Sequence, residues 1–530
     1  MTTLLSGALC AFVTALLSAL GSALAARRLL HFMQLESYQL PGYFKTLRRN
    51  AARAFAPGLL LAAAGAAACA LALWLSDSAR GWAAAGAWLL VAVAGAALRA
   101  AQRGTKAKKP LVFTPRMKRL QAMTLAVCLA LGLLCLALLG PAGLAALPLL
   151  LPLQVALAAL CAQPIERHIN MGFFRDAQRR LDARPGLIRI GITGSYGKTS
   201  TKFLLGTILS ERYNVLVTPS SFNTPMGVTR IIRERLQAYH EVFIAEMGAR
   251  HVGDIAELVE LVHPTVGLLT SVGPQHLDTF GTLENIKKTK YELIEGLPAD
   301  GLAVFARDGA ICEELYARCT LARKRLAGEG VRVENLTVGP FGSRFELVEG
   351  DARVSCETKL LGEHAIGNLL LCAETARGLG LSLEEIARGV RKCSPVEHRL
   401  QLIGGKGGVT VIDDAFNSNP RGAQAALRVL ARFPKRRIIV TPGMVELGGE
   451  EDAFNEAFGR EMAGSVDVAI LVGRRHTAPI RKGLLEAGFD ERCLHVVGSL
   501  EESTQVLGAL VRAGDTVLYE NDLPDNYSEG

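Results

Sequence analysis

A glycine-rich turn carries the side chains best suited to chemistry. Residues 188–202 read Ile-Arg-Ile-Gly-Ile-Thr-Gly-Ser-Tyr-Gly-Lys-Thr-Ser-Thr-Lys, so a β-branched run enters the turn and a helix-like run leaves it. In this order the glycines let backbone N–H groups close around phosphate oxygens, the lysine neutralises terminal phosphates, and the threonine hydroxyl can hold Mg²⁺. The sequence therefore predicts a phosphate-binding loop, against the alternative of an ordinary glycine-rich turn. The residues expected to contact nucleotide here are Gly194, Ser195, Gly197, Lys198, Thr199 and Ser200.

Three more polar residues stand where an α/β sheet places chemistry. Glu246 ends the strand-like run 242–246, and a carboxylate at such a position is the usual partner of the loop threonine on Mg²⁺. His276 follows another strand-like run, and Lys290 lies in a polar, helix-like stretch. Taken alone, Lys290 fits a solvated surface lysine, and His276 fits a structural histidine equally well.

Short apolar runs alternate with helix-like stretches and indicate the elements that position these residues. This βαβ order predicts parallel sheets, which bind ligands at the carboxyl ends of their strands. The glycine-rich stretch 404–408 precedes a second set of runs, so two α/β domains are expected to meet near residue 396. The first set comprises residues 187–192, 215–218, 242–246, 266–271 and 302–305, and the second 409–413, 437–441, 468–472 and 516–519.

Up to about residue 165 the chain is dominated by Ala, Leu, Val and Gly. Five apolar segments there approach the roughly 20 residues that a helix needs to cross a bilayer. The two loops after the first and third segments are strongly basic, which predicts that they face the cytoplasm, that the amino terminus lies outside, and that the α/β domains are cytoplasmic. The segments are Leu4–Ala26, Pro57–Leu75, Trp82–Leu98, Ala122–Leu139 and Ala142–Cys161.

Several other interpretations of the composition are weaker. A cleaved signal peptide would need a basic start, whereas Arg27 and Arg28 follow the first apolar segment. The net charge of +9 lies largely in loops expected to face anionic lipid, and no basic stretch is interleaved with aromatics, so nucleic acid is not an expected partner. Residues 166–184 are expected to form a basic amphipathic connector along the membrane.

Ordered motifs between about residues 185 and 450 resemble those of the Mur ligase family. They are Gly-Ile-Thr-Gly-Ser-Tyr-Gly-Lys-Thr-Ser (191–200), Phe-Asn-Thr-Pro-Met-Gly (222–227), Ala-Glu-Met-Gly-Ala (245–249), Gln-His-Leu-Asp (275–278), Lys-Thr-Lys-Tyr-Glu (288–292), Gly-Glu-His-Ala-Ile-Gly-Asn (362–368), Glu-His-Arg (397–399) and Asp-Asp-Ala-Phe-Asn-Ser-Asn-Pro (413–420). The resemblance is nearest to the member that adds D-alanyl-D-alanine to a peptidoglycan precursor. It implies a central P-loop ATPase domain (185–395) and a Rossmann-like domain (396–530), preceded here by a five-helix transmembrane domain (1–165).

The resemblance implies an ATP-dependent carboxylate–amine ligase that works through an acyl phosphate. Lys198, His276 and Lys290 would be catalytic, with Lys290 carbamylated by CO₂. Two Mg²⁺ ions would be held by Thr199, Glu246, His276 and the carbamate. The remaining residues that the resemblance implies are Asn368, Arg399 and Asp414 for ATP, and Asn223 and Thr224 for substrate.

The chain also departs from the family pattern. The five apolar segments stand in place of a small soluble domain that grips the UDP-sugar, so the precursor is expected to be either a soluble nucleotide-linked molecule or a lipid-linked one, with membrane lipid as a further partner. A membrane scaffold that binds nucleotide without ligation is a second hypothesis, although it would not need His276 and Lys290. A transporter driven by the loop is a third, and Ile192 in place of the common first Walker glycine argues against it.

Overall fold

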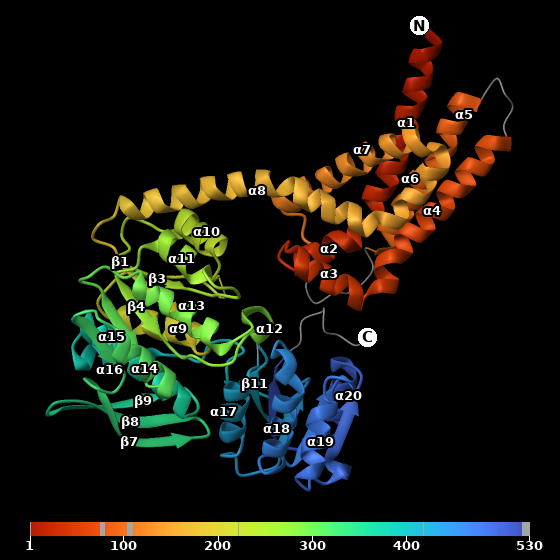
Figure 1. Cartoon of the computed structure of the whole chain (residues 1–530). Coiled ribbons are helices and arrows are strands. Elements are labelled where there is room, and N and C mark those ends of the chain that lie inside the picture. The colour runs from red at the N-terminus through yellow and green to blue at the C-terminus, as the bar shows by residue number, and fades with distance from the viewer. Residues whose placement is uncertain (1, 75–79, 103–109, 221, 417, 522–530) are drawn as a thin grey trace. The chain divides into compact units, whose positions relative to one another are not determined.

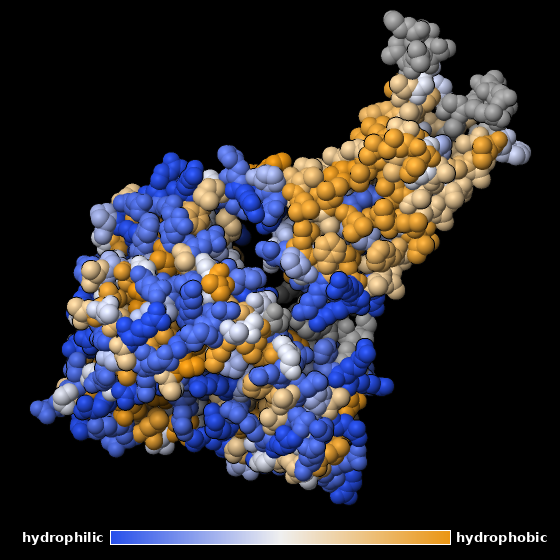
Figure 2. Space-filling model, viewed as in Figure 1, coloured by the Kyte–Doolittle hydropathy of each residue, from blue (hydrophilic) through white to orange (hydrophobic). Residues whose placement is uncertain are grey.

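The computed structural model describes residues 2–74, 80–102, 110–220, 222–416 and 418–521 (Figure 1). The chain divides into two compact units, and the boundary between Met171 and Gly172 falls inside one long helix. Each unit has its own hydrophobic core. On the face seen in Figure 2, apolar side chains gather over the first unit, whereas hydrophilic side chains prevail over the second.

The first unit is helical. Among the described residues, three stretches are long and apolar enough to cross a membrane, judged by length and composition alone: Ser6–Ala25, Ala51–Trp74 and Pro115–Asp182. A fourth apolar stretch, Ala85–Ala101, is shorter. The helices are α1 (Thr2–Ala25), α2 (Arg27–Leu35), α3 (Leu40–Arg49), α4 (Ala51–Trp74), α5 (Arg80–Ala87), α6 (Leu89–Ala101), α7 (Pro115–Ala146), the 3₁₀ turn η2 (Leu147–Leu150) and α8 (Leu151–Asp182).

These helices differ in detail from the five predicted segments. The third segment is divided between α5 and α6, which are interrupted at Trp88. The fourth and fifth lie on either side of a bend at Gly140 (φ 68°), where Pro141 follows and cannot donate a backbone hydrogen bond. Parts of two predicted loops, residues 75–79 and 103–109, lie outside the described residues.

The predicted connector at 166–184 is not a separate element, because α8 continues through it to Asp182. From Phe174 onward its apolar residues, including Ala177 and Leu181, are buried in the core of the second unit. Protein rather than lipid therefore covers that face of the helix, and the placement of the stretch along a membrane stays a prediction. Apolar positions at helical spacing do not reveal whether lipid or protein covers them.

The central domain of the second unit has a parallel six-stranded sheet in the order β2-β3-β1-β4-β5-β6. Except for the edge strand β6, which reads Arg-Lys-Arg-Leu, its strands are rich in apolar residues, in accordance with the helices that cover both faces of the sheet. The strands are β1 (Ile188–Thr193), β2 (Val215–Val217), β3 (Val242–Glu246), β4 (Val266–Leu269), β5 (Leu302–Phe305) and β6 (Arg323–Leu326). The helices are α9 (Lys198–Leu209), α10 (Pro225–Arg235), α11 (Asp254–Val262), α12 (Leu277–Phe280), α13 (Leu283–Glu295), α14 (Ala310–Arg318), α15 (Glu363–Gly378) and α16 (Leu383–Lys392).

A small antiparallel sheet, which the sequence analysis did not predict, belongs to the same domain. It consists of β7 (Arg332–Gly339), β8 (Gly342–Glu349) and β9 (Ala352–Thr358). Buried residues on β8 and β9, among them Phe345, Leu347 and Cys356, join the core of the parallel sheet. The small sheet thus extends the central domain.

The C-terminal domain has a second six-stranded sheet, in the order β10-β11-β15-β12-β13-β14. All neighbours in it are parallel except β10 and β11. The strands are β10 (Gln401–Gly404), β11 (Thr410–Asp414), β12 (Arg437–Thr441), β13 (Val468–Val472), β14 (Leu494–Val497) and β15 (Thr516–Glu520). The helices are α17 (Pro420–Leu430), α18 (Glu451–Ala463), α19 (Ala478–Glu486) and α20 (Leu500–Leu510), with 3₁₀ turns at Lys406–Gly408, Gly448–Glu450 and Glu491–Cys493.

Candidate active site

The glycine-rich turn lies between β1 and α9, at the carboxyl end of the central sheet. Gly194 (φ 150°) and Gly197 (φ 79°) have backbone conformations that favour glycine. A Cβ on Gly194 would also lie 2.9 Å from the backbone N of Ser271, in the segment after β4. Ser195 fixes the turn to that segment, because its Oγ donates to the Gly273 carbonyl at 2.9 Å. The turn is held open at the start of the 12-residue helix α9, where free N–H groups favour an anion.

Lys198 folds back over this turn. Its Nζ donates to the carbonyl oxygens of Gly194 (2.6 Å) and Ser195 (2.9 Å). Burial lowers the pKa of Lys198 to about 8, with Glu246 opposing the shift and Arg399 adding to it. A phosphate group entering the turn would give this ammonium stronger acceptors than two carbonyls and would favour its charged form.

Glu246, at the end of β3, joins several predicted residues. Its Oε2 accepts from Thr199 Oγ1 (3.0 Å) and from Lys202 Nζ (3.0 Å), and its Oε1 accepts from Asn223 Nδ2 (3.0 Å). Burial would raise the pKa of this carboxyl, but the charges of Lys202 and Lys198 outweigh burial and lower it. The side chain is therefore an anion. Lys202 was not among the residues predicted from the sequence, although its position one helical turn after Lys198 was a signal that could have identified it.

The segment between β2 and α10 lies beside this carboxylate. The Asn223 carbonyl accepts from Gly248 N at 2.8 Å, which ties the segment to the end of β3. Thr224 caps α10, with its Oγ1 accepting from Gly227 N at 3.3 Å. Of the two residues expected to face substrate, Asn223 points to Glu246, whereas the hydroxyl of Thr224 serves the helix.

His276 connects the two domains of the second unit. Its Nδ1 lies 2.7 Å from Oε2 of Glu446, a C-terminal-domain residue that the sequence analysis missed. Burial lowers the pKa of His276, and Glu446 only partly offsets this effect. Arg250 lies 3.6 Å from the other oxygen of Glu446. Both His276 and Glu446 have positive φ values (53° and 66°), in accordance with their places in tight loops.

Lys290 is only 2% exposed on α13, so the surface interpretation of this lysine is wrong. Its Nζ lies 5.8 Å from the centre of the Phe280 ring. Burial, with the charge of Lys198 adding to it, holds the pKa of Lys290 well below its ordinary value. The sequence did not predict this burial, because the neighbouring residues are polar. Only one face of α13 is exposed, and Lys290 lies on the buried face.

The linker after α16 and the first parallel strand of the C-terminal domain supply Arg399 and Asp414. The Arg399 guanidinium lies 4.5 Å from the centre of the Phe416 ring, and burial lowers its pKa while Asp414 and Glu246 oppose that shift. Asp414 Oδ1 accepts from Leu400 N at 3.1 Å. Burial raises the pKa of Asp414 to about 6, with Arg399 opposing.

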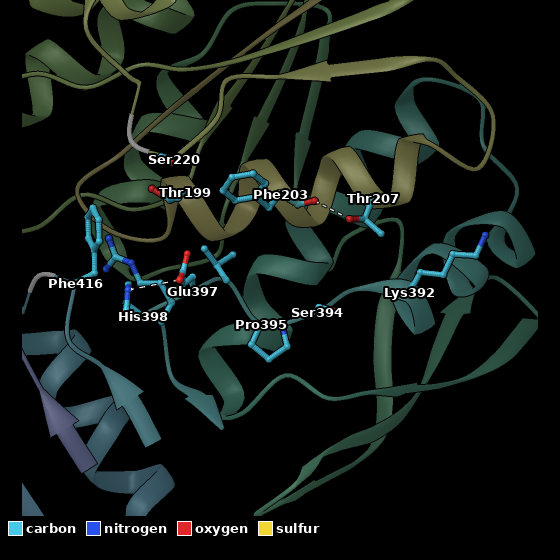
Figure 3. A pocket seen from close by; sticks show the side chains of 12 residues that line it. Thr199, Phe203, Thr207, Ser220, Lys392, Ser394, Pro395, Glu397, His398 and Phe416 are labelled. Carbon is cyan, nitrogen blue, oxygen red and sulfur yellow. Dashed lines mark hydrogen bonds and ion pairs between the residues drawn. The ribbon is translucent and has the colours of Figure 1, made fainter. Parts of the chain in front are cut away.

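A cavity of about 410 Å³ opens beside the turn (Figure 3). Phe203 and Thr207 of α9 form one wall, and the linker around Pro395 forms the opposite wall. Its lining residues are Thr199, Phe203, Thr207, Ser220, Lys392, Ser394, Pro395, Val396, Glu397, His398, Arg399 and Phe416. Asn368 lies beside the turn but does not line this cavity, and a Cβ on Gly197 would approach its Oδ1 to 3.0 Å.

The donor atoms at this site fit Mg²⁺. Thr199 and Glu246 offer hydroxyl and carboxylate oxygens, the hard ligands that this ion takes together with water and substrate phosphates. No group of three His, Cys, Asp or Glu side chains suited to a metal occurs within the part of the chain that the structure describes. A second ion at His276 would need Lys290 in an anionic form, because an ammonium cannot ligate a metal.

Comparison with known proteins places this site in a family. Residues 192–376 match the Mur ligase middle domain, and residues 398–519 match the Mur ligase glutamate ligase domain. The UDP-N-acetylmuramoyl-tripeptide–D-alanyl-D-alanine ligase of Mycobacterium tuberculosis is 34% identical over 366 residues, covering 63% of this chain and 70% of the relative. The enzyme of that name from Escherichia coli is 30% identical over 341 residues, covering 62% and 75%.

Solved structures of MurF enzymes have the same fold as this chain. MurF from Acinetobacter baumannii has a TM-score of 0.61 at 25% identity, covering 68% of this chain and 79% of that one. MurF from Thermotoga maritima, solved in complex with ADP, has a TM-score of 0.59 at 24% identity, covering 67% and 80%. Fold and site together define an ATP-dependent ligase. The chain belongs to the Mur ligase family, and the relatives named here are MurF enzymes, so the membership predicted from the motifs is confirmed.

Proposed function

We propose that this chain joins D-alanyl-D-alanine, or a similar amine, to the terminal carboxylate of a UDP-N-acetylmuramoyl tripeptide at the expense of ATP. The observation that carries the proposal is the contact of Thr199 with Glu246 beside Lys198. This contact lies on a fold that the chain shares with MurF enzymes. A nucleotide-binding scaffold would need the turn but not the buried second set at His276 and Lys290.

The reaction has two steps. The substrate carboxylate attacks the γ-phosphorus of ATP, which gives an acyl phosphate and ADP. The amine nitrogen then attacks the acyl carbon, phosphate leaves, and the nitrogen loses a proton to give the amide. Both steps bring negative oxygens together, so the site must supply cations and fixed donors. Lys198 and the N–H groups of the turn bind the phosphates, and Arg399 approaches from the C-terminal domain.

Two Mg²⁺ ions and a lysine carbamate complete the proposed site. Thr199 and Glu246 would hold the first ion, and His276 with carbamylated Lys290 the second; when bound, the ions offset the phosphate charge. The burial of Lys290 supports the modification, because a lowered pKa increases the share of neutral amine, and only the neutral amine adds to CO₂. The carbamate would then be an anion facing Lys198, whose charge now disfavours the ammonium.

The cavity beside the turn is the proposed site of the adenine ring. Phe203 and Phe416 offer aromatic surface, and the polar atoms of the linker lie around them. Such a mixture suits a flat heteroaromatic ring with polar edges. Asn368 and Asp414 would contact the nucleotide outside this cavity.

We also propose that the first unit anchors the ligase in a membrane, with the ligase domains in the cytoplasm. Three long apolar helices and the basic loops between the apolar segments support this placement. The proposed parts are a transmembrane domain (1–165), a connector (166–184), a central domain (185–395) and a C-terminal domain (396–530). The membrane-embedded unit favours a lipid-linked precursor as the alternative acceptor.

A ligation assay tests the function. The full chain, purified in detergent or nanodiscs, is given ATP, Mg²⁺ and D-alanyl-D-alanine with either the UDP-linked tripeptide or its lipid-linked form. We expect the amide by mass spectrometry and one ADP per amide with the UDP-linked acceptor, and neither product with Lys198→Ala. Turnover of only the lipid-linked acceptor would replace the proposed substrate, and ligation by Lys198→Ala would overturn the assignment of the phosphate-binding loop.

A further inference from the structure

Lys202 is a fully buried lysine to which the reaction above assigns no role. Its side chain is 0% exposed on α9, one helical turn after Lys198. Its Nζ donates to Glu246 Oε2 at 3.0 Å and to the Ser220 carbonyl at 2.6 Å. The ammonium also lies 4.5 Å from the centre of the Phe203 ring. A lysine in such a place is costly to bury, so its contacts must compensate for the lost hydration.

Lys202 binds the same oxygen that the metal site offers. Oε2 of Glu246 accepts from both Lys202 and Thr199, and Oε1 is held by Asn223. Both carboxylate oxygens therefore have donors before any ion arrives, and the charge of Glu246 is balanced by a lysine rather than by a divalent cation.

We propose that Lys202 is a positioning residue that acts as the resident counter-ion of Glu246, so that Mg²⁺ enters this site together with nucleotide and not before it. This inference rests on the proposed function. A buried carboxylate without a counter-ion would attract a divalent cation strongly, because Coulomb interactions grow as the local dielectric constant falls. A fixed ammonium 3.0 Å from the ligating oxygen opposes such binding. The negative charges of a bound nucleotide outweigh that single positive charge.

The contact with Ser220 adds a positional consequence. Ser220 lies in the segment that leads to Asn223, and Lys202 joins this segment to the end of β3. The ammonium thus keeps Glu246 in one rotamer and keeps Asn223 within reach of it, whether or not an ion is bound.

The test measures Mn²⁺, a spectroscopic substitute for Mg²⁺, by electron paramagnetic resonance on the full chain with and without ADP. We expect wild type to bind Mn²⁺ at least ~10-fold more tightly when ADP is present, a coupling within the usual range for linked sites. In Lys202→Met, which keeps length and apolar bulk, we expect Mn²⁺ to bind ~10-fold more tightly than in wild type without ADP, and the coupling to shrink. Lys202→Arg retains the charge and should retain the coupling.

Two controls separate this effect from a loss of structure. Lys482→Met removes an exposed lysine of α19 that pairs with Glu456, away from the nucleotide cavity, and it should leave the coupling unchanged. Adding Glu246→Gln to Lys202→Met should abolish the tight Mn²⁺ binding without ADP. A folded Lys202→Met that binds Mn²⁺ no more tightly than wild type without ADP would overturn the proposal.

The wild-type measurement decides the question even if Lys202→Met does not fold. Equal Mn²⁺ affinity with and without ADP in wild type would also overturn the counter-ion role. Failure of the proposed function is distinguishable, because it would appear as absent ADP binding or absent amide product, neither of which depends on the Mn²⁺ coupling.

Discussion

Three lysines near the glycine-rich turn, one half-buried and two buried, have different surroundings and hence different chemistry. Lys198 lies against two carbonyls with its pKa lowered to about 8, and under the proposed function it would exchange these carbonyls for phosphate. Lys202 is paired with Glu246. Lys290 has its pKa held well below the ordinary value by burial, with Lys198 rather than a carboxylate as its principal charged neighbour. The residue type is the same, and burial and neighbouring charge decide its role.

The carbamate on Lys290 can be tested by chemical rescue. Lys290→Ala should abolish ligation, and short carboxylic acids such as acetate or propionate should restore part of it by supplying the missing anion. Ligation rates with and without added acid make the measurement. Lys288→Ala, on the exposed face of the same helix, should keep its activity and gain nothing from the acid. Absence of any rescue in a folded, ADP-binding Lys290→Ala would argue against the modification.

Replacing Asp414 with Asn should raise the stability of the ligase unit and lower its ATP turnover, and the gain in stability should depend on pH. The folded pKa of Asp414, about 6, lies above the ordinary value of 3.8, so burying the charged form costs free energy above pH 6 and costs nothing below pH 3.8. Asp414→Asn should therefore stabilise the ligase unit by about 1–2 kcal/mol at pH 8, allowing for partial solvent access. This gain in stability should fade between pH 6 and pH 4. The variant should also turn over ATP more slowly than wild type.

Thermal unfolding of wild type and Asp414→Asn across this pH range provides the measurement. The exposed Asp351→Asn, in the turn between β8 and β9, serves as the control and should not gain the stability expected of Asp414→Asn at pH 8. A gain in stability that is equal at pH 5 and pH 8 would show that the buried charge is not its cause.

At the scale of elements, close backbone approach matters as much as side-chain packing. Gly194 is required where the turn meets the segment after β4. In the helical unit, α1 and α6 meet at Gly21 and Gly95, and a Cβ on Gly95 would lie 2.6 Å from Gly21 Cα. Small residues at such a crossing let helix backbones pack directly, as they do in membrane bundles.

The helix crossing gives a prediction for the first unit. Gly95→Leu should push α1 and α6 apart and destabilise the helical unit by about 1–3 kcal/mol, the usual cost of overpacking. Thermal stability in detergent, followed by size-exclusion chromatography, measures the effect. Gly86→Leu is the matched control, because nothing lies within 4 Å of a Cβ there. Equal behaviour of the two variants would refute the close contact.

At the scale of the whole chain, the second unit combines two domains whose contacts converge on the site. His276 meets Glu446, and Arg421 of α17 pairs with Asp308 at 2.7 Å. These links hold Arg399 and Asp414 beside the glycine-rich turn of the central domain. The first unit supplies helices of membrane-spanning length in addition.

The proposed topology can be checked on the intact chain. A reporter fused within residues 75–79 should be active outside the membrane, and one within residues 103–109 should be active in the cytoplasm, because the basic loops are retained there. The opposite pattern would invert the orientation. If both reporters were active on the same side, the predicted membrane span between them would not exist.

The local sequence alone predicted the glycine-rich turn and most strands of the two large sheets. The predicted phosphate-binding turn needs glycines, a lysine and a hydroxyl in a fixed order, and most of the parallel strands in both sheets contain short runs of Val, Ile and Leu. Such signals survive in the sequence because each depends on neighbours within one strand or one helical turn.

Tertiary structure alone decided the rest. Glu446 reaches His276 across 170 positions, and Lys202 reaches Glu246 across 44, distances over which no local pattern carries information. The apolar face of α8 looked suited to lipid and is buried against protein from Phe174 onward. Burial and charge pairing depend on which surfaces the folded chain brings together, so the state of Lys290 and the partner of Lys202 appear only in three dimensions.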